Sequence, residues 1–211
     1  MYMSRVEIDV ENRKKIKDLI HLSAIHNWVE TSFPNEFEKN LRTRKLWRID
    51  RLNGKTYLIL VSQTKPNLAI LEKYGVENTA QTKDYDKFLD KLKQNQKMKF
   101  RITLNPVITK SMGKGNRGIA QPQLKIKDQE KFLLDRAEKN GFRIKQGEFL
   151  ITQRGTEKFE KKGQKSVDLV KAVYEGTLEI INVELFKQTL INGIGKKKAY
   201  GFGLMTVIPL E

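Results

Sequence analysis

The stretch RKLWRIDRLNGKTYLILVSQ, residues 44–63, decides the fold that this sequence predicts. Its two runs RKLWRID and TYLILVSQ have the apolar and aromatic content that is typical of strands. They flank RLNGK, in which Asn53-Gly54 is the dipeptide that the tight turn of a β-hairpin prefers. We therefore expect two adjacent antiparallel strands here, around which the rest of the first half can be placed.

A strand and a helical region come before this hairpin. YMSRVEIDV, residues 2–10, places its apolar side chains close to a period of two, as a half-buried strand does. Residues 11–34 have a helical pattern with two apolar stripes out of phase, and a break near residues 21–23 reconciles them. Ser23 can cap the second piece, and Pro34 ends it.

A helix and a strand come after the hairpin. KPNLAILEKYG, residues 65–75, predicts a short helix that Gly75 closes. A polar connection then leads into a strand centred on residues 100–104. The resulting order, β-α-β-β-α-β, is the split βαβ or ferredoxin-like pattern.

The second half of the sequence shows a similar order of helices and strands, but less clearly. Residues 107–123 predict a loop, residues 128–142 a helix closed by Asn140-Gly141, residues 182–193 a last helix and residues 204–210 a final strand. The predicted fold class is α+β, with two tandem ferredoxin-like (RRM-like) domains and antiparallel sheets. We expect the domains to comprise residues 1–95 and 96–211.

The charge balance indicates a polyanionic partner. The chain has 41 Lys and Arg against 25 Asp and Glu, a formal net charge of +16. Such an excess attracts nucleic acid by counterion release and steering. An anionic membrane is the rival partner, but the sequence has neither a basic amphipathic helix with aromatic anchors nor a lipidation signal. We expect RNA or DNA and no membrane.

The absence of cysteine from the sequence excludes some kinds of catalysis and metal binding. With no Cys and only two His, the sequence offers neither thiolate catalysis nor a usual structural zinc site. We therefore expect no metal and no cofactor. No run of 18 apolar residues and no signal-peptide pattern is present, so a cytoplasmic protein is expected.

The segment GIGKKKAYGFGL, residues 193–204, is the first candidate for binding a polyanion. Glycine lets a phosphate backbone approach the chain closely, and lysine attracts phosphate without base specificity. The simpler alternative is a helix cap followed by a solvated lysine turn. The glycine spacing matches neither a Walker loop nor a dinucleotide fingerprint. The residues concerned are Gly193, Gly195, Lys196, Lys197, Lys198, Gly201 and Gly203.

Two other segments carry clustered basic residues. RGTEKFEKKGQKS, residues 154–166, predicts a basic loop or hairpin tip that can track a nucleic-acid groove, although a solvated hairpin is at least as common. The loop of residues 110–118 is the other. The candidate RNA-binding residues in them are Arg154, Lys158, Lys161, Lys162 and Lys165, and Lys110, Lys114 and Arg117.

His26 is the one candidate for acid or base catalysis near neutral pH. It flanks the apolar stripe of the second helical piece, so it can lie at the rim of a cleft. A lone histidine there is more often structural. RNA, however, carries its own nucleophile in the 2′-hydroxyl, and cleavage needs only proton transfer and stabilisation of charge on phosphorus.

The sequence resembles the CasE-type CRISPR-associated endoribonucleases of the RAMP superfamily, the repeat-processing subunit of the Cascade surveillance complex. The resemblance runs nearly end to end, and the glycine-rich segment is its most specific part. The segments that carry it are MYMSRVEID, IHNWVETSFP, LWRID, DYDKFLDKL, FRITLNPV, RAEKNGF, YEGTLEI and GIGKKKAYGFGLMTVIP.

The resemblance implies a substrate and a reaction. The chain would bind the repeat stem-loop of precursor CRISPR RNA and cleave at the 3′ base of the hairpin without a metal. The products would carry a 2′,3′-cyclic phosphate and a 5′-hydroxyl, and the mature RNA would stay bound within Cascade beside its other subunits. His26 occupies the place of the family's principal catalytic residue.

One departure from the family concerns Ser23. The family has a tyrosine three residues before the histidine, where it is thought to position or activate the 2′-hydroxyl, and Ser23 stands there in this chain. Either Ser23 is only a cap, or Lys110, Lys114 or a tyrosine elsewhere replaces the phenol. The alternatives to an endoribonuclease are a catalytically silent RNA-binding subunit of the same complex and an unrelated RNA-binding protein.

Overall fold

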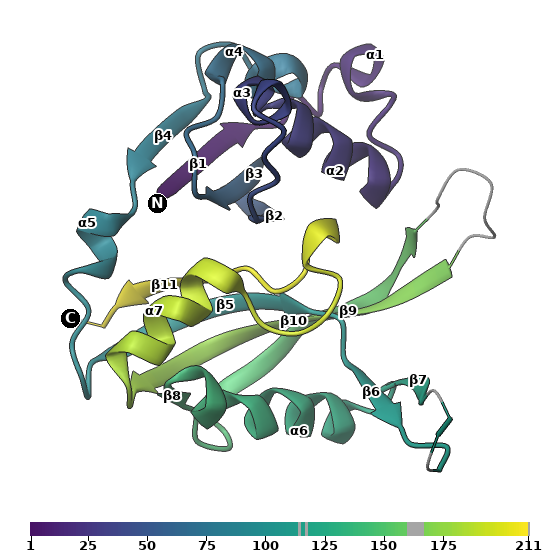
Figure 1. Ribbon diagram of the computed structural model, residues 1–211, viewed down its shortest axis with the longest axis vertical. Helices are drawn as coiled ribbons and strands as arrows, with labels where there is room; N and C mark the ends of the chain where they lie inside the picture. The colour runs from purple at the N-terminus through teal and green to yellow at the C-terminus, as the bar shows by residue number, and fades with distance from the viewer. Residues whose placement is uncertain (114, 117, 160–166, 211) are drawn as a thin grey trace.

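Four antiparallel strands form the first sheet, in the order β2-β3-β1-β4. The computed structural model of the protein describes residues 1–113, 115–116, 118–159 and 167–210 (Figure 1). Asn53 and Gly54 both have positive φ, 52° and 77°, and form the predicted turn between β2 and β3. The strands are β1 (Tyr2–Glu7), β2 (Lys45–Leu52), β3 (Lys55–Ser62) and β4 (Gln81–Asp84).

The helices of the first half are short, and the break predicted near residues 21–23 separates the first two. Ser23 does not cap the second one, because that helix begins at Leu22 and its N-cap residue is His21. Pro34 begins a third helix instead of lying at the end of the second. The helices are α1 (Arg13–Ile16), α2 (Leu22–Thr31), α3 (Pro34–Glu38) and α4 (Leu68–Leu71), which a 3₁₀ turn (Glu72–Tyr74) extends.

The strand that closes the first unit is β4, not the strand of residues 100–104 that the sequence indicated. β4 pairs with β1 from Tyr2–Asp84 to Arg5–Gln81. Its sequence QTKD is polar and largely exposed, so it lacks the alternation that marks a strand. The strand at residues 97–104 belongs to the second sheet.

The second sheet has the order β11-β5-β10-β8, and β9 also pairs with β10. With α6 and α7 between its strands, it repeats the topology of the first unit, which confirms two tandem ferredoxin-like folds with antiparallel sheets. The elements are α5 (Asp86–Leu89), β5 (Lys97–Leu104), α6 (Ile126–Ala137), β8 (Phe142–Arg143), β9 (Phe149–Phe159), β10 (Val167–Ile180), α7 (Val183–Asn192) and β11 (Met205–Pro209).

A two-stranded ribbon is inserted between β5 and α6. Here the sequence predicted a loop, but β6 (Val107–Lys110) pairs with β7 (Ile119–Pro122). Both strands are mostly exposed, so apolar patterning could not reveal them. In Figure 1 the ribbon projects at one end of the second unit, beside α6.

Two large apolar clusters stabilise the fold, and a third, small one includes Phe159, Leu169 and Phe202. The first lies between the first sheet and its helices and includes Trp28, Val29 and Leu58. The second fills the space between the second sheet, α6 and α7, and extends into the first sheet through Leu46 and Val61. The two sheets are therefore joined through the second cluster.

Arg48 on β2 joins the two sheets. Its guanidinium is buried and donates two hydrogen bonds to the Asp50 carboxylate, at 2.8 and 2.6 Å. The same group donates to the carbonyl oxygens of Arg101 on β5 and Leu204 just before β11, at 2.8 and 2.9 Å. Bidentate and backbone hydrogen bonds together satisfy this buried charge.

Candidate functional site

His26 lies on α2, at the edge of the face that packs on the first sheet. Ile25, Trp28 and Val29 are buried in the first core, whereas the His26 side chain is 30 % exposed. The helical period places the histidine next to the apolar stripe, as the sequence indicated. A cavity of about 370 Å³ opens beside it, lined by His26, Asn27, Glu30, Glu36, Phe37, Leu41, Arg42, Thr43 and Lys45.

The glycine-rich segment, residues 193–204, lies against β2 of the first unit. Gly193, Gly195, Gly201 and Gly203 all have φ between 68° and 87°, a region that other residues rarely adopt. A Cβ on Gly201 would lie 2.7 Å from the Trp47 ring. The Trp47 indole Nε1 donates to the carbonyl oxygen of Ala199 at 2.9 Å. The glycines therefore serve close packing and chain direction, whatever else they contact.

Tyr200 is the residue of the glycine-rich segment that contacts His26. It ends a 3₁₀ turn (Lys198–Tyr200), and its ring meets the His26 ring edge to face, with centroids 5.3 Å apart. The ring of Phe159, the last described residue of β9, lies 4.3 Å from Tyr200 on another side. α2, the glycine-rich segment and the β9–β10 hairpin thus converge at His26, and Figure 1 shows the hairpin rising toward α2.

The lysines of the glycine-rich segment point in different directions. Lys196 donates to the Thr109 hydroxyl of the β6–β7 ribbon at 2.8 Å, which links the two basic segments. The Lys197 ammonium lies 5.0 Å from the centre of the Phe159 ring. Lys198 is half-buried, and burial lowers its pKa, with a further contribution from the nearby charge of Arg44.

The other candidate RNA-binding residues divide into three groups. Lys110 and Lys158 are exposed, on β6 and β9. Arg154 donates to the Gln129 side chain at 2.8 Å and to the Leu124 carbonyl, so its guanidinium ties β9 to α6. Lys114, Arg117, Lys161, Lys162 and Lys165 lie outside the described residues.

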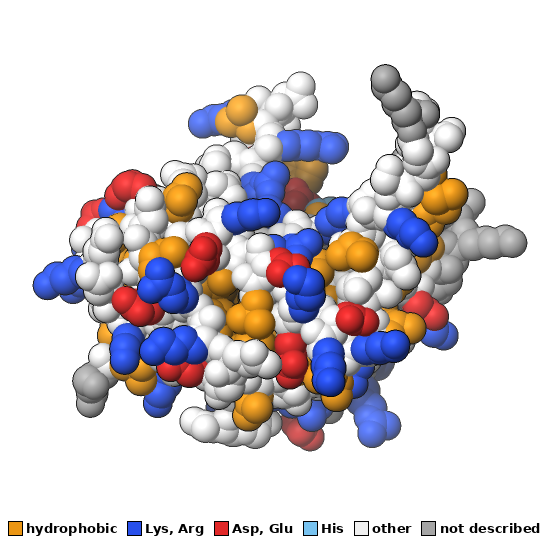
Figure 2. Space-filling model, turned by 90° about the horizontal axis from the view of Figure 1, so that it is seen from below, with side chains coloured by type: hydrophobic (Ala, Val, Ile, Leu, Met, Phe, Trp, Pro, Cys, Tyr) orange, Lys and Arg blue, Asp and Glu red, His pale blue; other side chains and the backbone are white. Residues whose placement is uncertain are grey.

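Positive charge alone does not locate an RNA site on one face of the molecule. On the face seen in Figure 2, Lys and Arg side chains are interspersed with acidic ones. Such mixed surfaces carry weaker local fields than single-sign patches. The convergence of basic segments on one titratable side chain is therefore the more specific feature.

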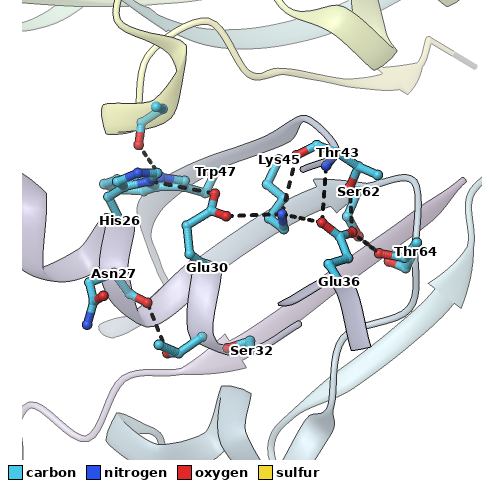
Figure 3. Close-up of polar contacts among 12 residues, drawn as sticks. His26, Asn27, Glu30, Ser32, Glu36, Thr43, Lys45, Trp47, Ser62 and Thr64 are labelled. Atoms are coloured by element: carbon cyan, nitrogen blue, oxygen red, sulfur yellow. Dashed lines mark hydrogen bonds and ion pairs between the residues drawn. The ribbon is translucent and has the colours of Figure 1, made fainter. Parts of the chain in front are cut away.

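A row of charged side chains continues from His26 into the protein (Figure 3). Glu30, one turn further along α2, has one carboxylate oxygen 3.8 Å from His26 Nδ1 and the other 3.1 Å from Lys45 Nζ. Lys45 in turn lies 2.8 Å from Glu36. The sequence analysis missed this row. The i,i+4 spacing of His26 and Glu30 was a usable signal, whereas a lysine in a strand gives no hint of burial.

The surroundings shift the pKa values of two of these groups. Burial lowers the pKa of His26; Glu30 opposes this shift and Lys45 adds to it. Burial raises the pKa of Glu36, but hydrogen bonds from Lys45, Thr43 and Thr64 outweigh it and bring the value to about 2. Near pH 7 the His26 imidazole is therefore neutral, and Glu36 is ionised.

Ser23 lies one helical turn before His26 and is half-buried. Within the described residues, no group of three or more His, Cys, Asp or Glu side chains is placed to hold a metal ion. Across the same residues, no helix is long and apolar enough to cross a membrane.

Two tandem ferredoxin-like units, with the glycine-rich segment of the second in contact with His26 of the first, define the structural class of this protein. A family model described as CRISPR associated protein matches residues 1–209. The chain therefore belongs to this family of CRISPR-associated proteins.

Individual relatives cover nearly the whole chain. It is 26 % identical to the CRISPR-associated endoribonuclease Cse3 of Thermus thermophilus, over 99 % of this chain and 100 % of the relative. Cse3 of the same organism, bound to an RNA representing a pre-cleavage complex, matches with a TM-score of 0.79 at 24 % identity, over 99 % and 98 % of the two chains.

A second solved structure gives the same fold. Cas6e of Escherichia coli K-12 matches with a TM-score of 0.68 at 23 % identity, over 100 % of both chains. The resemblance to CasE-type proteins that the sequence indicated is thereby confirmed.

Proposed function

We propose that this protein is a metal-independent endoribonuclease that processes precursor CRISPR RNA. It binds the repeat stem-loop, cleaves at the 3′ base of the hairpin and keeps the mature RNA within a Cascade complex in the cytoplasm. The observation that carries the proposal is the meeting of α2, the glycine-rich segment and the β9–β10 hairpin at His26. Similarity over the full length to an endoribonuclease, Cse3, supports it.

The chemistry follows from groups within reach of His26. The RNA 2′-oxygen attacks the adjacent phosphorus, the bond from phosphorus to the 5′-oxygen breaks, and a cyclic phosphate remains. The 2′-hydroxyl loses a proton and the departing 5′-oxygen gains one. A neutral imidazole with a lowered pKa can accept the first proton. Lys198, in the same 3₁₀ turn as Tyr200, is our candidate for stabilising the charge of the phosphorane.

The RNA stem would lie across the basic segments. Exposed Lys158 on the hairpin and Lys110 on the ribbon are placed for phosphate contacts, and Lys196 connects the ribbon to the glycine-rich segment. The deep major groove of A-form RNA is poorly accessible to side chains, so shape and phosphate contacts should dominate recognition. In this arrangement residues 1–95 supply the catalytic histidine, and residues 96–211 supply most of the binding surface.

Tyr200 is our candidate for the phenol that position 23 lacks. Its ring contacts the His26 ring from the glycine-rich segment rather than from α2. Because Ser23 is one turn from the histidine and much shorter than tyrosine, its hydroxyl has less reach toward an RNA 2′-oxygen. Tyr200→Phe should therefore slow cleavage about tenfold while RNA binding is retained, and Ser23→Ala should change the rate far less. Equal rates for Tyr200→Phe and wild type would exclude this role.

The reaction class is tested with chelator and with substrate chemistry. Purified protein is incubated in EDTA with repeat RNA from the CRISPR array of its own organism, and with the same RNA carrying one 2′-deoxynucleotide before the scissile phosphate. We expect a single cut with a cyclic-phosphate end in the first RNA and none in the second. Cleavage of the deoxy substrate, or a strict need for added metal, would refute the mechanism.

The substitution at position 23 supports one competing function, a silent RNA-binding subunit. Such a protein would bind the stem-loop tightly and release no product in the same assay. Absence of any preference for the repeat stem-loop would instead indicate an unrelated RNA-binding role.

A further inference from the structure

The charged row beside His26 is built from three elements, α2, α3 and β2. Lys45, on β2, contacts Glu30 of α2 at 3.1 Å and Glu36 of α3 at 2.8 Å. Its side chain is 2 % exposed, and its ammonium also lies over the Phe33 ring. A lysine so buried keeps its charge only with well-placed acceptors, and the two carboxylates provide them.

Glu36 is the fixed end of the row. It accepts hydrogen bonds from the backbone N–H of Thr43 at 3.1 Å and from the hydroxyls of Thr43 and Thr64. These bonds leave Glu36 little freedom, and through Lys45 they restrain Glu30. Glu30 itself is 29 % exposed, and one of its carboxylate oxygens is held by Lys45 at 3.1 Å.

The charges of the row suit a histidine that changes its protonation state. Glu30, Lys45 and Glu36 together carry one net negative charge beside the imidazole. When His26 gains a proton, the four groups become neutral as a set. The separation of 3.8 Å between Glu30 and Nδ1 is longer than a hydrogen bond, and such contacts often tighten only in the complex with substrate.

We propose that Glu30, held by the buried Lys45–Glu36 pair, is the positioning residue of His26. Its carboxylate faces Nδ1 and favours the tautomer that carries the proton there, which leaves Nε2 unprotonated and available to the RNA. It also stabilises the imidazolium that forms once a proton has been taken up. This inference rests on the proposed function, because it assigns the residue that prepares its catalytic base.

The groups around the imidazole are consistent with Glu30 as the positioning residue and His26 as the base. Glu30 is the acidic group facing Nδ1 from the same helix, Lys45 approaches from β2, and the Tyr200 ring packs from the glycine-rich segment. Arg42 lines the same cavity from the connection before β2. Of these, Glu30 alone stabilises the protonated imidazole by its charge.

The direct test measures His26 itself. The chain has only two histidines, so its imidazole signals are assigned with a His26→Ala variant. Nitrogen-15 shifts and a pH titration are recorded for wild type, Glu30→Gln and Glu184→Gln, the last altering a glutamate on α7 that is 80 % exposed. Glu30→Gln should lower the His26 pKa and move the neutral tautomer toward a protonated Nε2. Glu184→Gln should change neither. Unchanged tautomer and pKa in Glu30→Gln would overturn the inference.

Cleavage provides the second readout. General acid–base catalysis supplies about 10²- to 10⁴-fold, and we expect Glu30→Gln to lose about tenfold of the single-turnover rate with unchanged RNA affinity. Its rate profile should move to lower pH with the His26 pKa. A fall in affinity with an unchanged rate at saturating RNA would contradict a positioning role.

Lys45→Met removes the ammonium group that contacts Glu30 but keeps the Glu30 carboxylate itself. A thermal melt identifies loss of folding, and in the folded variant the tautomer should shift as in Glu30→Gln because Glu30 is released. A wild-type tautomer in folded Lys45→Met would show that the pair does not hold Glu30. If wild-type protein cuts no RNA, the proposed function fails, but the magnetic-resonance result still decides whether Glu30 controls His26.

Discussion

At the scale of single residues, Glu36 makes the sharpest prediction about stability. Its pKa falls from the ordinary 4.5 to about 2 because the hydrogen bonds it accepts outweigh burial. A carboxylate with a depressed pKa stabilises the fold fully above its unfolded pKa and loses this contribution as pH falls toward the folded value. The shift corresponds to roughly 3 kcal/mol. Stability should therefore decrease between about pH 4.5 and pH 2.

Glu36→Gln isolates that contribution. Chemical denaturation at pH 7 should show a loss of roughly 3 kcal/mol, and the variant's stability should vary less than wild type between pH 4.5 and pH 2. Glu38→Gln, an exposed position on the same helix, serves as the matched control and should behave like wild type. A full acid dependence retained in Glu36→Gln would contradict the assignment.

The sequence could predict His26 but not the residues behind it. His26 can be identified from the sequence because it lies beside an apolar helical stripe, in a segment that resembles a known family. Lys45 lies in a strand where lysine usually faces solvent, and its burial depends on α2 and α3 approaching β2 in space. The Tyr200 contact spans 174 positions and likewise requires the assembled fold.

At the scale of elements, the glycine-rich segment positions the chain against the first unit. Gly201 has φ of 83°, and any side chain there would meet the Trp47 ring. Gly201→Ala should displace the segment, so the Ala199 and Tyr200 contacts weaken. We expect a lower melting temperature and a cleavage rate reduced about tenfold or more. Tryptophan fluorescence, to which both Trp28 and Trp47 contribute, follows the displacement at Trp47 when it is recorded in a Trp28→Phe background.

Gly147→Ala is the matched control for this change. Gly147 also has a positive φ, 88°, but an added Cβ meets nothing within 4 Å. Both variants carry the strain of a left-handed backbone, about 1–2 kcal/mol, and only Gly201→Ala adds the steric clash. Equal effects of the two on cleavage would mean that the packing against Trp47 is unimportant.

Element prediction succeeded where local signals were strong. Asn53-Gly54 marked the β2–β3 turn, and Asn140-Gly141 marked the end of the α6 region, where Gly141 adopts a left-handed conformation. β4 and the β6–β7 ribbon were missed because their residues are mostly exposed and show no apolar alternation. For β4 the partner, β1, is also distant in sequence. Ser23 was misplaced because the helix starts at Leu22, two residues earlier than an N-cap at Ser23 would place it.

At the scale of the whole molecule, the two units should unfold together. Their sheets share an apolar cluster, and Arg48 carries hydrogen bonds from β2 to both β5 and the chain before β11. Calorimetry of the wild-type protein should show one transition with equal calorimetric and van't Hoff enthalpies. Two separate transitions would mean that the shared core contributes little.

Arg48→Met tests the polar part of this connection. Removal of one partner from a buried ion pair costs about 3–5 kcal/mol, because Asp50 loses its bidentate donor. Arg51→Met, an exposed position on the same strand, is the control and should change stability little. The Arg48 connection between the two units could not be predicted from the sequence. The sequence indicated the two ferredoxin-like folds correctly, but not which surfaces of the two units pack together.

In the mechanism we propose, His26 performs the cleavage chemistry beside the glycine-rich segment. The most direct measurement compares single-turnover cleavage and binding of the repeat stem-loop by wild type and His26→Ala. We predict that cleavage falls by about 10²-fold or more, while RNA affinity stays within a factor of about two. Cleavage at the wild-type rate by His26→Ala would contradict the account.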